Sequence, residues 1–458
     1  MKKIEMTTGS IPKKILQFSL PMIVGSIFQL TYSTIDGIVI GRFIDKSALA
    51  AVGAATPIFN ILLFLLVGLC NGASILMSEL FAQKKPKTLK QNIGTSISAG
   101  SILSIILTVL IIVFARPILK ATGVKPELLK DATNYLIFVS IGLVFSFINN
   151  IYTAALRSTG DSLRPLYILA LTSVINIGLD FAFVLGFKMG VIGAAIATSI
   201  SMALSAIICV FYAAYVDDLF KFKLSDFKIV KPQLIETSKY AIASALQQIV
   251  LFIGKSIVQI SINTLSIDAQ AAFTAASKID DYAITPIQCF GNTAAMFIAQ
   301  NRGAHKPERC KKGLFTGMIL SVIYASIACL VVYFGNNLLV KMFLDSEDNV
   351  AGVIEEGAKY YQYMAFFYFF PALTNSVQSY FRGLGKLNIV FYSTTVQIIF
   401  RASSSFFLIK SFEITGAALC TGVGWTFMLL FEVPILIYYL RTKKGLNHTS
   451  SVDVIKYE

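Results

Sequence analysis

Two aspartates lie inside apolar stretches of this 458-residue chain, and each follows a polar residue by four positions. Tyr32 precedes Asp36, and Asn176 precedes Asp180, so on a helix each pair shares one face. A charged side chain at the centre of a membrane helix costs about 2.5–3.5 kcal/mol on insertion scales, so such residues are expected to have a function. Two carboxylates close together in a low dielectric do not both ionise easily, and such a pair binds and releases a proton. Na⁺ could take the place of the proton, because carboxylate, amide and hydroxyl oxygens are suitable ligands for it.

Further polar side chains in the same half of the chain would join this site if their helices come together. They are Asn149, Asn150, Thr153 and Thr198, which offer amide and hydroxyl oxygens. The residues therefore predict an ion-titratable cluster in the first half of the chain. For each aspartate the alternative is a buried hydrogen bond that only joins helices.

Membrane helices are the elements that must position these side chains. Apolar residues make up 55% of the chain and charged residues 14%, whereas soluble domains carry about 25% charged residues. Twelve segments are long enough to cross a hydrocarbon core of about 30 Å, and each must be helical to satisfy its own backbone hydrogen bonds in lipid. These segments are residues 15–41, 48–80, 92–115, 131–156, 165–187, 191–216, 239–263, 269–299, 312–334, 357–381, 388–410 and 414–440.

The distribution of basic residues predicts the topology. The formal net charge is +14, and most Lys and Arg residues fall in the tails and in the loops on the side of the amino terminus. The positive-inside rule then places both termini in the cytoplasm. The excess charge is explained by topology, so we expect no nucleic-acid partner.

The second half of the chain repeats the first. Gln29 recurs as Gln248 and Arg157 as Arg382, at separations between 219 and 225 residues. A duplicated membrane bundle is the usual architecture of a transporter. We therefore predict an all-α integral membrane protein with twelve transmembrane helices in two pseudo-symmetric six-helix lobes. The predicted parts are a cytoplasmic tail at 1–14, the lobes at 15–216 and 239–440, a cytoplasmic linker at 217–238 and a second tail at 441–458.

Several motifs, in their order and spacing, resemble the multidrug and toxic compound extrusion (MATE) family. They are residues 32–36 with Gly41-Arg42, 156–161 with Pro165, 193–198, 299–304 and 381–385. The resemblance implies a V-shaped transporter that exports organic, often cationic and amphipathic compounds against an inward H⁺ or Na⁺ gradient. It places the coupling ion, including Na⁺ if Na⁺ is used, on Asp36, Asn176, Asp180 and Thr198. Many relatives carry a glutamate in span seven, where this chain has Gln247, Gln248 and Lys255, so we place the ion in the first lobe.

Lys255 stands out because of the duplication. Gln248 and Lys255 repeat the seven-residue spacing of Gln29 and Asp36 with the charge reversed. We expect Lys255 to pair with Asp280 or Asp281 and to influence substrate preference or the switch between states; a purely structural ion pair is the alternative. Arg401 is expected to neutralise Glu432, with binding of an anionic group as the alternative. The aromatic residues between 360 and 370 are candidates for stacking on a flat cation or for ordinary contact with lipid. The residues assigned to substrate binding are Tyr32, Gln29, Asn150, Thr153, Gln248, Lys255 and Asp281.

These expectations together predict a secondary antiporter of the cell membrane and no enzyme. No nucleotide-binding loop is present in the sequence, so the energy should come from an ion gradient. We expect a monomer with a small organic substrate, membrane lipids around it and no cofactor besides the coupling ion. A lipid or lipid-linked oligosaccharide flippase of the same superfamily is the main alternative; a membrane enzyme and a passive channel remain as weaker ones.

Overall fold

The computed structural model describes residues 4–43, 46–343, 350–443 and 445–446. Within these ranges, side chains are described except at 35–46, 48 and 224. The described chain is built from helices and their connecting turns, without a strand. The predicted all-α fold class is therefore confirmed.

The helices follow one another with short connections. They are α1 (Ile11–Phe43), α2 (Lys46–Ala82), α3 (Pro86–Ala121), α4 (Pro126–Ser158), α5 (Leu163–Asp180), the π-helix η1 (Phe181–Gly186), α6 (Gly190–Val216), the 3₁₀ turns η2 (Asp218–Phe220) and η3 (Leu224–Phe227), α7 (Lys231–Ile262), α8 (Ile267–Gly303), α9 (Pro307–Lys341), α10 (Val350–Phe367), α11 (Phe369–Gly383) and α12 (Leu387–Thr442). Prolines at the first helical positions start several of them, because a proline there loses no helical hydrogen bond.

The apolar segments coincide with these helices. Nine helices of the described part are long and apolar enough to cross a membrane by length and composition. One of them, α12, is a single run of 56 residues that bends at Glu413, where φ is 51°, and this bend separates the expected segments 388–410 and 414–440. The expected segment 357–381 falls on α10 and α11, which are interrupted at Tyr368. The count of twelve crossings stays a prediction.

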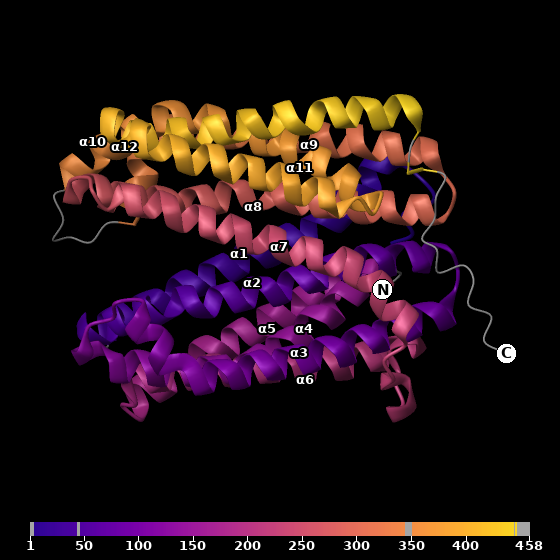
Figure 1. Ribbon diagram of the computed structural model, residues 1–458, viewed down its shortest axis with the longest axis horizontal. Coiled ribbons are helices and arrows are strands. Elements are labelled where there is room, and N and C mark those ends of the chain that lie inside the picture. The colour runs from indigo at the N-terminus through magenta and orange to yellow at the C-terminus, as the bar shows by residue number, and fades with distance from the viewer. Residues whose placement is uncertain (1–3, 44–45, 344–349, 444, 447–458) are drawn as a thin grey trace. The chain divides into compact units, whose positions relative to one another are not determined.

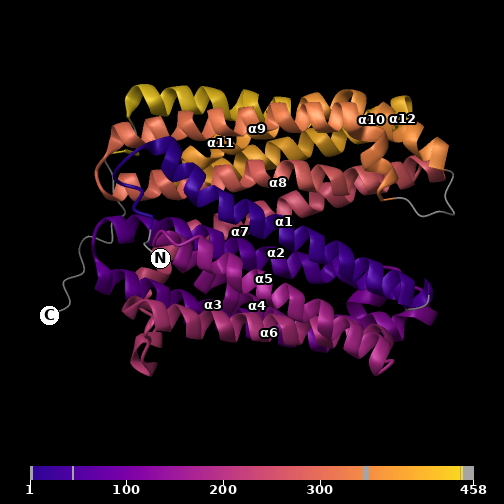
Figure 2. The same cartoon turned by 180° about the vertical axis from the view of Figure 1, so that it is seen from behind.

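The chain divides into two compact units that do not simply follow the halves of the sequence. The first unit contains Val24–Ala245, and the second contains Glu5–Ile23 together with the described residues from Leu246 onward. Figures 1 and 2 show α2 to α6 as one group of helices and α8 to α12 as another. The first turns of α1 therefore belong to the second unit, and the first half of α7 belongs to the first.

Close backbone packing fastens the first half of α7 into the first unit. Gly68 and Gly72 of α2 form a G-x-x-x-G pair, a spacing that lets membrane helices approach closely. A Cβ at Gly72 would overlap the main-chain carbonyl of Tyr240, and one at Gly68 would overlap the backbone of Ala245. Neither position therefore accepts a larger residue without moving the helices apart.

The segment that leads into α7 is held on the same unit by side chains of α3. Lys90 donates to the carbonyl of Lys221 at 2.8 Å and Ser98 to that of Phe227 at 2.8 Å. Asn92 donates to the Thr237 hydroxyl at 2.8 Å. Exposed main-chain carbonyls of the polar segment 217–230 are thus satisfied by α3.

The segment that leads into α1 is held on the second unit in a similar way. Asn301 and Arg309 both donate to the carbonyl of Met6, at 3.2 and 3.1 Å. Arg309 also donates to the carbonyl of Gly9 at 3.0 Å, and Lys306 donates to that of Thr7 at 2.9 Å. The side chain of Met6 is completely buried. The motif 299–304, with Arg309 beyond it, therefore anchors the described amino-terminal residues.

Candidate functional site

The buried polar face of α5 carries one half of the predicted ion site. Asn176 and Asp180 lie one turn apart, and their exposed fractions are 4% and 1%. Thr172 and Ser173 are also buried on this helix, so its inner side is polar over about two turns. Asp180 is the last α-helical residue, and η1 begins directly after it. A π-helical turn is rare and often marks a functional site, because it changes the direction of the side chains that follow.

The other half of the predicted ion site belongs to α1. Asp36 lies in this helix, but its side chain is outside the described residues. Tyr32, one turn earlier, is half-buried, and Gln29 is exposed. A meeting of Asp36 with Asp180 therefore stays a prediction.

The remaining first-unit candidates lie on α4 and α6, which pack against each other. Thr198 is half-buried and donates its hydroxyl to the carbonyl of Ala194 within its own helix at 3.0 Å. Asn150 likewise donates to the carbonyl of Ser146 at 2.8 Å. The helices are joined by Ser205, which donates to Asn149 at 3.1 Å.

Thr153, also on α4, lies 3.9 Å from the Cys209 sulfur of α6. The hydroxyl of Thr198 and the amide of Asn150 therefore bond locally, while Asn149 and Thr153 make contacts between helices. A role of these side chains in binding an ion or a substrate stays a prediction.

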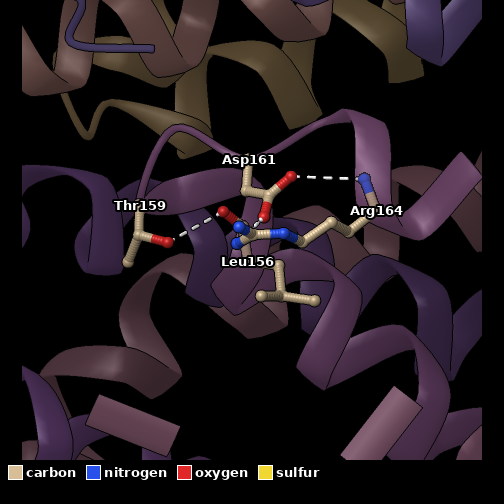
Figure 3. A network of polar contacts seen from close by, with 4 residues as sticks. All are labelled: Leu156, Thr159, Asp161 and Arg164. Carbon is tan, nitrogen blue, oxygen red and sulfur yellow. Dashed lines mark hydrogen bonds and ion pairs between the residues drawn. The ribbon is translucent and has the colours of Figure 1, made fainter. Parts of the chain in front are cut away.

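The turn between α4 and α5 fixes where α5 begins. Figure 3 shows that Arg164 reaches back to Asp161 with its guanidinium and with its main-chain N–H, the latter at 3.2 Å. Thr159 donates to the carbonyl of Leu156 at 2.9 Å. Asp161 is only 7% exposed. These contacts show a structural role for the 156–161 motif, because they fix the first turn of α5, the helix that carries Asp180.

In the second unit, the structure brings Lys255 and Asp281 together. The ammonium of Lys255 on α7 donates to Asp281 Oδ1 on α8 at 3.1 Å. Both side chains remain accessible, with exposed fractions of 66% and 45%. Gln248, two turns before Lys255, is half-buried. Of the two partners that the sequence allowed, the structure selects Asp281.

Asp280 has a different environment from its neighbour. It is 8% exposed and accepts hydrogen bonds from the hydroxyls of Tyr360 at 2.7 Å and Tyr368 at 2.6 Å. These lengths are typical of hydroxyls that donate to a carboxylate. Tyr361 donates instead to the carbonyl of Ala276 at 3.0 Å. Sequence reasoning listed Tyr361 among the stacking candidates, whereas the structure uses its hydroxyl, and those of Tyr360 and Tyr368, to bind α8.

The expected pairing of Arg401 with Glu432 is wrong. Glu432 is fully buried, and no ion pair or hydrogen bond joins it to Arg401 among the residues that the structure describes. Arg382 donates to Asn292 at 3.1 Å and to Gln378 at 2.9 Å. Helical spacing on one chain segment does not reveal which distant helix lies opposite, and this is why the sequence suggested the wrong partner.

Comparison with known proteins assigns this arrangement to a family. The MatE family model matches residues 21–182 and 243–407, which together make up most of the chain. The chain belongs to the MATE family. MATE proteins are multi-pass membrane transporters, so the predicted resemblance is confirmed.

Individual MATE relatives cover most of the chain at low identity. The probable multidrug resistance protein YoeA of Bacillus subtilis (strain 168) is 25% identical over 348 residues, 74% of this chain and 75% of that protein. The probable multidrug resistance protein NorM of Thermotoga maritima is 22% identical over 448 residues, 94% and 93% of the two chains. A crystal structure of a MATE protein in complex with MaL6 is 21% identical, with a TM-score of 0.88 over 98% of this chain and 100% of that one. At this identity the likeness shows the fold alone.

Proposed function

We propose that this MATE protein is a secondary antiporter that exports amphipathic organic compounds, including cations, across the cell membrane in exchange for H⁺ or Na⁺. The observation that carries the proposal is the buried Asp180, next to Asn176 at the end of α5, in a family of membrane transporters. The relatives named as multidrug resistance proteins support the export of several compounds. Both termini are placed in the cytoplasm by the distribution of basic residues.

The proposed coupling uses one ion site in the first unit. Asp36, Asn176, Asp180 and Thr198 bind the ion, and an ion at this site lowers the affinity for the exported compound. By linkage, the compound lowers the affinity for the ion by the same factor. An inward ion gradient then drives the compound outward, because each binding of an ion favours the release of the compound.

The experiment is gradient-driven transport in proteoliposomes with Asp180→Asn. A fluorescent organic cation is offered with a H⁺ gradient alone and then with a Na⁺ gradient alone, which also identifies the coupling ion. We expect the parent to accumulate the cation and Asp180→Asn to lose uphill accumulation while still folding. Asp218→Asn is the matched control, because this carboxylate lies in η2 with a side chain that is 90% exposed. Undiminished uphill accumulation by Asp180→Asn would refute the proposed coupling site.

A further inference from the structure

Glu432 is a buried carboxyl side chain of the second unit that the proposed function leaves unexplained. It lies on α12, and its exposed fraction is 0%. Neither of its oxygens has a hydrogen-bond partner among the residues that the structure describes. An ionised carboxylate without a partner is very costly to bury, and such a group is expected to neutralise instead. Acidic residues inside membrane transporters often mark proton or ion sites.

The bend in α12 brings Glu432 to the level of Ser393. After the bend at Glu413 the helix returns along its own first part, since a Cβ added at Gly424 would lie only 2.8 Å from that of Arg401. Glu432 is about two turns farther from the bend than Gly424. On the first part of the helix, Ser393 is about two turns farther from the bend than Arg401. The two side chains therefore occupy the same level.

Helix α11 covers the side of α12 that carries Glu432. Trp425 and Tyr439 lie seven residues before and after Glu432, a spacing that keeps all three on one face. Trp425 stacks on Phe370 of α11 with 6.4 Å between the ring centroids. Tyr439 meets Phe381 of the same helix at 5.6 Å. The carboxyl group of Glu432 therefore faces the middle of α11.

The polar side chains at this level have already used the hydrogens that a carboxylate would need. Ser393 and Thr394 both donate to the main-chain carbonyl of Val390, at 3.0 and 2.9 Å. The amide of Gln378, on α11, donates to the same two hydroxyl oxygens at 3.2 Å each. The amide of Gln247, on α7, donates to Thr394 at 3.1 Å and to the Gln378 oxygen at 3.3 Å. A hydroxyl carries one hydrogen and a side-chain amide two, so no donor remains on these four side chains.

A protonated carboxyl group fits these surroundings better than a carboxylate does. The carboxylate only accepts hydrogen bonds, whereas the protonated group has an O–H to donate. The Ser393 oxygen accepts one bond, from Gln378, so one of its two lone pairs is left for such a donor. A metal ion fits less well, because the Gln378 oxygen already accepts from Gln247 and, at 2.9 Å, from the guanidinium of Arg382. A cation bound there would meet this positive charge.

Arg382 has N–H groups to spare at this level. Its guanidinium donates to Asn292 at 3.1 Å and to Gln378 at 2.9 Å, which uses two of its five N–H groups. Arg382 lies in the last turn of α11, where the carbonyls of a helix end favour a positive charge. The guanidinium is therefore compensated without a carboxylate, yet it has donors available for one.

Few other charges lie on the helices around this carboxyl group. The sequence has no charged residue within about two turns of Gln247 on α7 or of Asn292 on α8. On the first part of α12, Arg401 is about two turns away towards the bend. The ionisable residues of α11 are Arg382 and Tyr380. Tyr380 precedes Arg382 by two positions, so it points to nearly the opposite side of the helix.

We propose that Glu432 is a proton-binding site of the second unit and that the guanidinium of Arg382 takes the place of the proton when it leaves. In the arrangement that the structure shows, the carboxyl group holds the proton. On release, the O–H bond breaks and a water molecule accepts the proton. The carboxylate then accepts N–H bonds from Arg382, which gives up its bonds to Asn292 and Gln378. One proton thus changes the contacts among α8, α11 and α12. This site is additional to the proposed coupling site in the first unit.

Infrared spectroscopy of the purified full-length protein in detergent tests the proton site, because the C=O band of a protonated carboxyl group is separate from the bands of carboxylates. At neutral pH, Glu432→Gln should lose the intensity of one carboxyl group from this band, and Glu432→Asp should retain it. Glu413→Gln, which replaces an exposed glutamate of the same helix, is the matched control and should leave the band unchanged.

Two results would overturn the proton site. One is an equal band in the parent and in Glu432→Gln, since Glu432 would then be ionised. The other is a Glu432→Gln variant that does not fold, by size-exclusion chromatography, while Glu432→Asp does, because an amide should replace a neutral acid.

The role of Arg382 is tested by an alkaline titration of the same band. In the parent, the Glu432 intensity should disappear as pH rises. In Arg382→Gln it should persist to a pH about one to three units higher, because the charge that compensates the carboxylate is gone. Arg382→Lys keeps the charge and should titrate like the parent, as should the control Arg441→Gln, which removes an exposed arginine at the end of α12. Loss of the band at the same pH in Arg382→Gln and in the parent would show that Arg382 does not replace the proton. Both measurements are made without a gradient, so failure of the proposed antiport would leave their outcome unchanged.

Discussion

The two tyrosines that hold Asp280 allow a quantitative test of how the second unit is stabilised. Tyr360→Phe and Tyr368→Phe each remove one hydroxyl that donates to this buried carboxylate, at 2.7 and 2.6 Å. Hydrogen bonds to charged groups contribute about 1.5–3 kcal/mol each. We expect each variant to lower the free energy of unfolding by that amount. The double variant should cost more than either single variant, because it removes both hydroxyls that donate to the buried carboxylate.

Tyr361→Phe is the control for this prediction. Tyr361 is adjacent in sequence and fully buried, but its hydroxyl donates to the uncharged main-chain carbonyl of Ala276 at 3.0 Å. Loss of a neutral hydrogen bond costs only about 0.5–1.5 kcal/mol. The same atom is removed in all three variants, so differences in volume do not enter. The order of stabilities therefore isolates the charge of Asp280.

Thermal unfolding in detergent can be followed with a thiol-reactive dye, because all six cysteines are free and buried. For a unit of about 200 residues, 1 kcal/mol corresponds to a shift in Tm of about 2–4 °C. We expect the midpoint to fall by about 3–12 °C in Tyr360→Phe and in Tyr368→Phe, and by a smaller amount in Tyr361→Phe. If Tyr361→Phe proves as destabilising as the other two, the assignment of Asp280 as the charged acceptor of this cluster is wrong.

Three further predictions concern the packing of α7 and the two lead-in segments. Gly72→Leu should prevent α2 from packing on Tyr240 and lower the yield of folded protein, measured by size-exclusion chromatography; Gly53→Leu, on the same helix, where the added Cβ meets open space, controls for the larger side chain. Arg309→Ala removes its donors to two carbonyls and should increase amide hydrogen exchange at residues 5–10, with unchanged exchange at 221–230 as the control. The pKa of Asp226 is lowered, first by the main-chain N–H of Lys223 and then by the Lys90 ammonium. The stability that this carboxylate contributes is therefore present above the ordinary pKa of 3.8 and is lost as pH falls through the lowered pKa. Asp226→Asn should therefore loosen the 221–230 segment at neutral pH, measured by limited proteolysis, but match the parent well below pH 3.8; a difference that persists in acid would contradict this reasoning.

Hydropathy and spacing predicted the helical fold because each membrane span must satisfy its own backbone. The expected segments fall on the helices, but most helices extend beyond them, by as much as eight residues at the start of α7. The irregularities themselves were not predicted. The π-helical turn after Asp180 and the positive φ of Glu413 depend on packing between distant helices, and hydropathy contains no information on such packing.

Polar partners were predictable only where the duplication narrowed the choice. Lys255 could be paired because its repeat position drew attention to it and because α8 follows α7 directly, so that an acidic residue within reach was easy to name. The partners of Asp280 are 80 and 88 residues away, on α10 and at the Tyr368 interruption before α11. No local pattern connects residues at that distance. The failure to find the expected pair of Arg401 and Glu432 has the same cause.

The neighbouring carboxylates of α8 show how one helix separates structural and functional charge. Successive residues on a helix differ in direction by about 100°, so Asp280 and Asp281 cannot share an environment. Asp280 points into the core and accepts hydrogen bonds from two hydroxyls, whereas Asp281 points outward and meets the exposed Lys255. Substitution of the first should therefore change stability before it changes which compounds bind, and substitution of the second should do the opposite. An Asp280→Asn variant with the same stability as the parent would contradict this division of roles.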